Sequence, residues 1–189
     1  MNSVVSVKES SSIPTSRNYA VICSFFILGA VLGIMAVSSY GGSSFENNFL
    51  DSIKLKGFFP LFLSVFKYHF ISFAAGLLLF GFLVIPLISA VKGFFVSFTS
   101  YVYLLSCGFD FLSVSFIVLF LLQFISVVSM FFLMNSAMLF SYRLTVTFFD
   151  NQVLKRIFTG TLLKVFFVVL FIILLLCFLI YSYFSDFHT

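Results

Sequence analysis

The sequence predicts an all-α fold: a bundle of about five transmembrane helices with short helices on the membrane surface. Two observations lead to this class. Of the 189 residues, 62% are hydrophobic and only 8% are charged, so the chain lacks the charged surface that keeps a globular protein soluble. The apolar residues also gather in runs of about 20, the length that carries a helix across a hydrocarbon core of ~30 Å.

The length of the chain allows one compact membrane domain and leaves no room for a separate soluble domain. We expect a cytoplasmic, disordered tail at residues 1–18, a membrane domain at 19–184 and an external tail at 185–189. Within the domain, spans are expected at about 19–38, 70–88, 93–108, 111–136 and 165–183.

The first span carries Gly29 and Gly33 in a G-x-x-x-G pattern. Glycines at this spacing let two helix backbones approach closely, so the span is expected to pack against another span of this chain or of a second copy. Ala36, Val37 and Ser38 resemble a signal-peptidase site, and a cleaved signal peptide is the alternative. The apolar run is longer than the 7–15 residues usual for a signal peptide.

Three segments between the spans are expected at the membrane surface, and two of them have the pattern of surface helices. In residues 43–53, Ser43 and Glu46 have capping-box spacing and apolar residues then recur at helical intervals. Residues 58–66 contain Pro60 and are expected to form a second interfacial segment. Residues 153–158 combine an apolar face with Lys155 and Arg156, which predicts a cytoplasmic surface helix.

The second and third spans are predicted to meet in a turn at residues 89–93, where the single charge, Lys92, precedes Gly93. Pro86 interrupts the end of the second span. Lys92 has two interpretations: it marks a cytoplasmic turn, or it contacts a lipid phosphate or an acidic partner.

The fourth span belongs to an uncharged stretch at residues 111–142. Gln123 and Asn135 are amides of the kind that bond to neighbouring helices. Twelve residues apart, they are expected on different faces, with Asn135 and Ser136 where the helix leaves the membrane core.

The basic residues predict the orientation. Seven of them fall on the side of the amino terminus and three on the other, which places the amino terminus in the cytoplasm and the carboxyl terminus outside. The first group is Lys8, Arg17, Lys92, Arg143, Lys155, Arg156 and Lys164; the second is Lys54, Lys56 and Lys67.

No catalytic, metal-binding or cofactor-binding motif is visible, so we expect a protein that is not an enzyme. The net charge of +4 is scattered, which argues against nucleic acid as a partner.

Cys23, Cys107 and Cys177 are widely separated and are expected to fill the core. His69 is interpreted as an interfacial residue. Asp110 is expected in an outer turn; buried deeply, it would serve a proton or cation path.

The segment 82–88, with its apolar-Pro-apolar end, is followed by Lys92-Gly93-Phe94 and then by Phe98-Thr99. In these motifs and in its order of spans, the sequence resembles the stage II sporulation protein M family of bacterial membrane proteins. A weaker likeness lies at residues 122–123 and 134–137. The chain departs from the pattern at Ser97, which replaces a second glycine, and in its fourth span, which lacks a proline before Gln123.

The resemblance implies a non-enzymatic scaffold that recruits or anchors peptidoglycan-degrading proteins during septal wall remodelling and engulfment in sporulation. Its partners would be the lipid bilayer, other membrane or cell-wall hydrolase proteins and a second copy of itself. Candidate contact residues are Gly29, Gly33, Pro86, Lys92, Gly93, Gln123 and Asn135. The alternative is a membrane subunit of a transporter or channel, which the Pro- and Gly-interrupted second and third spans favour.

Overall fold

The computed structural model of the chain describes residues 15–40, 58–106, 114–149 and 161–186. Within these ranges every regular element is an α-helix and no strand is present, as the sequence predicts. The helices are α1 (Thr15–Tyr40), α3 (Phe58–Gly76), α4 (Gly81–Ser106), α5 (Val114–Phe149) and α6 (Thr161–Asp186).

Four helices of the described part are long and apolar enough to cross a membrane. They are α1, α4, α5 and α6, and they confirm an all-helical membrane protein. The fifth helix, α3, has 19 residues and is joined to α4 by a turn of four residues at 77–80.

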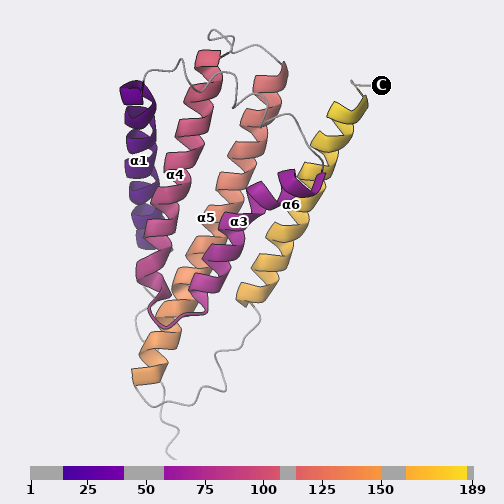
Figure 1. Ribbon diagram of the computed structural model, residues 1–189. Helices are drawn as coiled ribbons and strands as arrows, with labels where there is room; N and C mark the ends of the chain where they lie inside the picture. Colours follow the sequence, from indigo (N-terminus) through magenta and orange to yellow (C-terminus); the bar gives the residue numbers. More distant parts are fainter. Residues whose placement is uncertain (1–14, 41–57, 107–113, 150–160, 187–189) are drawn as a thin grey trace, which may run out of the picture.

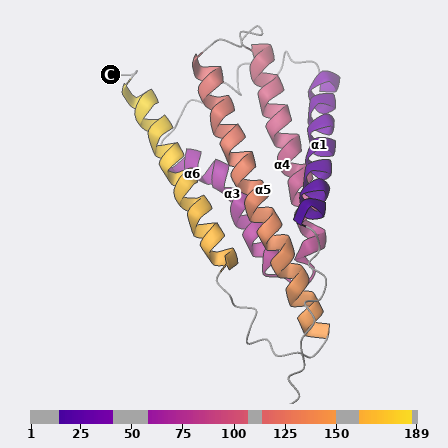
Figure 2. The same ribbon diagram turned by 180° about the vertical axis from the view of Figure 1, so that it is seen from behind.

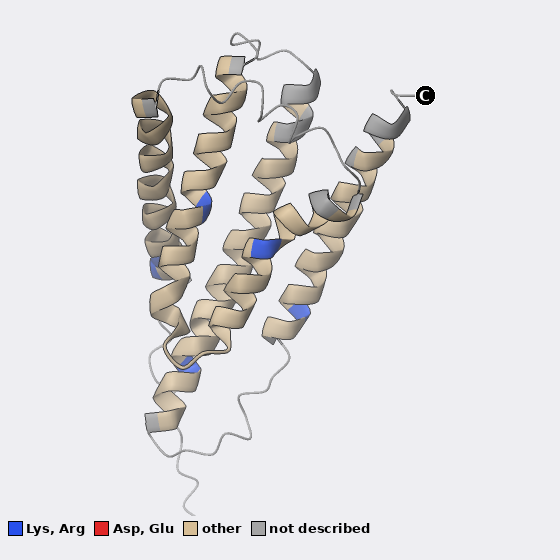
Figure 3. Ribbon diagram, in the orientation of Figure 1, with Lys and Arg blue, Asp and Glu red and all other residues tan. Residues whose placement is uncertain are grey.

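The helices α1, α4, α5 and α6 form one row, and α3 lies across one face of that row (Figures 1 and 2). The chain runs in one direction through α1, α4 and α6 and in the opposite direction through α3 and α5. One end of the bundle therefore holds the start of α1, the turn from α3 to α4, the end of α5 and the start of α6. Figure 3 shows basic residues on α1, α5 and α6 near this end.

The predicted turn at residues 89–93 is wrong, because α4 runs without interruption from Gly81 to Ser106. The expected spans at 70–88 and 93–108 are replaced by α3 and α4, which meet at residues 77–80. Lys92 and Gly93 therefore lie in the middle of a membrane-spanning helix. The small and polar residues there serve contacts with neighbouring helices, and a single sequence does not separate that use from a turn.

The fourth predicted span is also longer than expected. α5 continues through Asn135 and Ser136 to Phe149, and Asn135 is buried instead of marking an exit from the core. Residues 58–66, expected on the membrane surface, begin α3 and are continuous with the rest of that helix. The predicted surface helices at 43–53 and 153–158, the turn at Asp110 and most of both tails lie outside the described residues.

The core of the bundle lies between α3, α4, α5 and α6, around Ile85, Met130, Met134 and Ile173. Many large apolar side chains point outward instead, which is the arrangement expected when hydrocarbon surrounds the helices. Leu28 on α1 and Phe171 on α6 are 57% and 65% exposed, for example, whereas polar side chains such as His69, Ser89 and Asn135 are buried between helices.

Candidate functional site: a basic and polar centre within the bundle

The closest helix contact joins α1 to α4. A Cβ atom placed on Gly29 would overlap the carbonyl group of Ala90, and one on Gly33 would overlap that of Phe94. In return, a Cβ on Gly93 would overlap the carbonyl of Phe26. Only glycine allows the two backbones to come this close, so these residues form one seam between the two helices.

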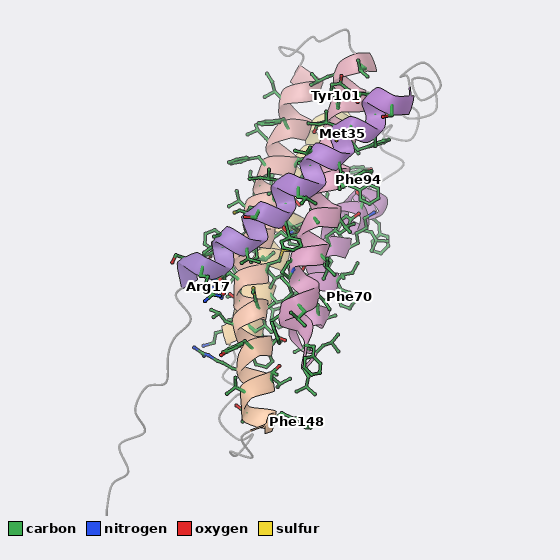
Figure 4. All side chains as sticks on the ribbon, turned by 90° about the vertical axis from the view of Figure 1, so that its left-hand side faces the viewer. Arg17, Met35, Phe70, Phe94, Tyr101 and Phe148 are labelled. Carbon is green, nitrogen blue, oxygen red and sulfur yellow. The ribbon has the colours of Figure 1, made fainter. Side chains whose placement is uncertain are left out.

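A buried hydroxyl group also forms a hydrogen bond across this seam. Ser89 Oγ of α4 donates a hydrogen bond of 2.9 Å to the carbonyl oxygen of Ile22 on α1, and both residues are fully buried. Figure 4 shows α1 crossing the bundle obliquely, from Arg17 at one end toward Met35 at the other. The residues that suggested a turn in the sequence therefore hold α1 against α4.

His69 ties α3 to α5. Its side chain is 0% exposed, and Nε2 lies 3.1 Å from the carbonyl oxygen of Ser126 and 3.2 Å from Ser129 Oγ. Nδ1 lies 3.2 Å from the carbonyl oxygen of Val65, one turn earlier on α3. The interpretation of His69 as an interfacial residue is therefore wrong, because the ring is enclosed by the bundle.

The two ring nitrogens of His69 face mainly acceptors. The Ser129 hydroxyl donates to the Ser126 carbonyl at 3.0 Å, so a proton on Nε2 is directed at the Ser126 carbonyl and the Ser129 oxygen, and a proton on Nδ1 is directed at the carbonyl of Val65. The Ser126 hydroxyl beside this group is buried and has no hydrogen-bond partner. A buried hydroxyl without a hydrogen-bond partner lowers stability, and this one lies next to an ionisable ring inside the bundle.

Lys67 and Lys92 lie around one aromatic ring. The ammonium nitrogens of Lys67 on α3 and Lys92 on α4 are each 5.0 Å from the centroid of the Tyr68 ring, so they are at most 10 Å apart. Lys67 Nζ is also 5.9 Å from the Phe95 ring centroid. Contacts between a cation and an aromatic face are favourable, but they leave the positive charge unneutralised.

The two lysines differ in their surroundings. Lys92 is only 7% exposed, whereas Lys67 is exposed on the outer side of α3. At a rise of 1.5 Å per residue, the distance along the axis of α4 is about 16 Å from Gly81 to Lys92 and about 21 Å from Lys92 to Ser106. Since the hydrocarbon core is ~30 Å thick, Lys92 lies near its middle if α4 spans it.

Gln123 connects α5 to α4. Its side-chain oxygen accepts a hydrogen bond of 3.0 Å from Ser100, and its nitrogen donates one of 3.2 Å to Thr99. Asn135, further along α5, is 6% exposed and its side-chain oxygen has no hydrogen-bond partner. The two amides therefore serve different contacts.

The turn between α3 and α4 is held by α5. Ser141 Oγ donates to the carbonyl oxygen of Leu78 at 2.7 Å and accepts from the backbone N–H of Phe82 at 3.0 Å, while Thr145 donates to the carbonyl of Leu79. These bonds satisfy backbone groups that the ends of two helices leave open. Gly81 is needed because a Cβ there would overlap the carbonyl of Ala75.

The structure thus brings three of the predicted contact residues, Gly29, Gly33 and Gly93, into one seam. Lys92 lies beside Gly93 but contacts Tyr68 of α3. Pro86 is buried within the first two turns of α4, which continues past it without interruption.

The sequence reasoning missed the contact between His69 and Ser129. One signal was present: His69 and Ser72 are three residues apart on α3, and Ser126 and Ser129 have the same spacing on α5. Polar residues at this spacing share a helix face, and two such faces in apolar helices are expected to meet.

Together, the fold and this centre define an all-helical integral membrane protein with ionisable side chains inside its bundle. Among the residues that the structure describes, no group of His, Cys, Asp and Glu is placed to hold a metal ion. Comparisons with protein-family models, with curated proteins and with solved structures find no match.

Proposed function

We propose that the protein is a membrane scaffold that holds partner proteins at the bacterial cytoplasmic membrane and is not itself an enzyme. The observation that supports this proposal is the way the interior polar groups are used. Ser89 and Gln123 each bond from one helix to another, Ser141 of α5 accepts from the backbone N–H of Phe82 on α4, and His69 joins α3 to α5. Such bonds fix the helices relative to one another, which suits a protein that presents a constant surface.

The proposed partners are peptidoglycan-degrading proteins, as the resemblance to stage II sporulation protein M implies. The proposed orientation has the amino terminus in the cytoplasm. Arg17, Arg143 and Lys164 lie near the helix ends that meet at one end of the bundle, in α1, α5 and α6, and the sequence that adjoins these helix ends adds Lys8, Lys155 and Arg156. With α3 as a fifth crossing, the carboxyl terminus lies outside.

Capture of the tagged chain from gently solubilised membranes tests the proposal. A scaffold retains cell-wall hydrolases or their partners, and its deletion slows thinning of the septal wall. The variant Gly29→Leu/Gly33→Leu, which disturbs the helix seam, should lose these partners, whereas Ala20→Leu on the exposed side of α1 should keep them. Purification without any partner, together with normal wall thinning in the deletion strain, would contradict the scaffold.

One observation favours the alternative, a transporter or channel subunit. Lys92 was expected in a turn and His69 at the membrane interface, yet both are buried in the bundle. Intramembrane ionisable residues commonly line ion or substrate paths. Retention of an ATPase in the same capture, or substrate uptake by vesicles containing the pure protein, would support this second function.

A further inference from the structure

The basic pair Lys67 and Lys92 lacks an anion in the described part of the chain. Residues 15–40, 58–106 and 114–149 contain no aspartate or glutamate, and in 161–186 the only acid is Asp186 at the end of α6. Figure 3 accordingly shows basic residues in the body of the bundle and no acidic ones where the ribbon is coloured. Two positive charges within 10 Å of each other are thus placed among apolar helices.

Charge in this position is costly. An ammonium group near the middle of the hydrocarbon costs at least several kcal/mol unless it reaches water or meets an opposite charge. Lys92 is too far from either end of α4 for its side chain to reach the lipid headgroups. Tyr68 reduces the cost by its contact with both ammonium groups, but an aromatic ring does not cancel two charges.

Lys67 lies at a surface that another helix can reach, whereas Lys92 is 7% exposed and acts on that surface by its charge, at most 10 Å from Lys67. Lys67 is exposed on α3, and Phe95, which is next to its ammonium group, is 45% exposed on α4. Val91 on α4 and Phe70 and Ile71 on α3 are exposed apolar neighbours in the sequence. A transmembrane helix could therefore pack its apolar side chains here and bring a polar one to the lysines.

The depth of Lys92 in the membrane determines which kind of anion can bind. Phospholipid phosphates lie outside the ~30 Å hydrocarbon core, so they do not meet a lysine near its middle without deforming the bilayer. A carboxylate on a transmembrane helix is carried to that depth by the helix itself. The exposed ammonium group of Lys67 can hold such a carboxylate by a charge-assisted hydrogen bond, and the buried charge of Lys92, at most 10 Å from that of Lys67, strengthens the attraction.

We propose that Lys67 and Lys92 form a binding site on the α3–α4 surface for a carboxylate side chain, aspartate or glutamate, in a transmembrane helix of a partner protein. This inference rests on the proposed scaffold function, since it names the chemistry by which a partner is held. The site is distinct from the glycine seam, which joins α4 to α1.

A designed peptide tests the site directly. The full-length protein, carrying a fluorescent label, is reconstituted in phosphatidylcholine vesicles with a labelled single-span Leu/Ala peptide that has one central Asp. A matched peptide has Asn at the same position. Energy transfer should show that the Asp peptide binds at least about tenfold more tightly, a difference of ~1.4 kcal/mol.

The variants assign this preference to the lysines. Lys67→Gln/Lys92→Gln should bind both peptides equally, and Lys67→Gln alone should reduce the preference, which matters if the double variant does not fold. Lys67 is exposed, so its substitution leaves the core intact. Arg143→Gln, at the end of α5, is the matched control and should keep the full preference. Equal binding of both peptides by the unaltered protein, or a preference that survives in the double variant, overturns the proposal.

Two other occupants have their own signatures. If a preference for Asp appears only after Glu46→Gln/Asp51→Asn, an acid of this chain fills the site and the proposal fails. If added phosphatidylglycerol abolishes the preference, and if this lipid stays bound to the unaltered protein but not to the double lysine variant, the site binds lipid phosphate and the proposal also fails.

Loss of the peptide preference with hydrolases still captured would reject this site alone. A clear preference without captured hydrolases would reject the proposed partner class alone.

Discussion

At the scale of single residues, His69 shows how a buried polar group joins two apolar helices. His69→Ala leaves a cavity and removes the partner of the Ser126 carbonyl and the Ser129 hydroxyl. We expect the free energy of unfolding to fall by ~2–4 kcal/mol, the range for core truncation combined with loss of a buried hydrogen bond. Unfolding in mixed micelles, followed by circular dichroism, measures the change.

The control for His69 is its neighbour Phe70, which is 56% exposed. Lipid or detergent tails cover that ring, so Phe70→Ala should change stability much less than His69→Ala. Similar losses in the two variants would show that His69 does not hold α3 to α5.

The contacts of single side chains between helices were only partly predictable from the sequence. That Gln123 bonds to a neighbouring helix followed from the cost of an amide in hydrocarbon, whereas Asn135 was expected where the helix leaves the core and is buried instead. The partners of Gln123, Thr99 and Ser100, did not follow, because they depend on the register between α4 and α5. His69 was assigned to the interface because Lys67 stands near it, although the two side chains point to different sides of α3.

At the scale of elements, the seam between α1 and α4 depends on glycine. Gly29→Leu/Gly33→Leu places side chains where the backbone of α4 lies. Overfilling of a packed site typically costs ~1–3 kcal/mol per position, so we expect a clear loss of stability on unfolding in mixed micelles. Ala20→Leu, on the exposed side of α1, should have little effect. Unchanged unfolding of the double variant would contradict the seam.

The turn between α3 and α4 gives a second prediction at this scale. Ser141→Ala removes the partner of the Phe82 N–H and of the Leu78 carbonyl, and we expect a loss of ~1–3 kcal/mol in unfolding free energy. Ser136→Ala is the matched control, because Ser136 Oγ bonds only one turn back, to Phe132 within α5. A loss in Ser136→Ala equal to that in Ser141→Ala would count against the cap.

The position of this turn was not predictable from local pattern. Lys92 and Gly93 have the residue types of a turn, and so do Gly76 and Gly81. The second pair forms the turn because Ser141 and Thr145 on α5 satisfy the open backbone groups there. Ser141 and Thr145 lie more than sixty residues further along the chain. One sequence therefore does not indicate which of the two pairs of residues they contact.

At the scale of the whole molecule, the fold class followed from composition and from the lengths of the apolar runs, because the bilayer imposes both. The orientation is a prediction of the same kind. In a cysteine-free variant, an impermeant maleimide applied to intact cells should label a cysteine at Ser44 and should not label one at Asn151. Labelling at Asn151 and not at Ser44 would reverse the orientation.

The central claim is that α4 is one continuous membrane-spanning helix with Lys92 near the middle of the bilayer. Spin labels at Leu83, Leu87, Val91 and Phe95 follow its exposed side at intervals of one turn. Their relative accessibility to oxygen and to a water-soluble nickel complex measures depth. We predict that depth increases from Leu83 to Val91 and that Val91 is shielded from the nickel complex. A position near Val91 as accessible to water as a loop would place a turn there and contradict the account.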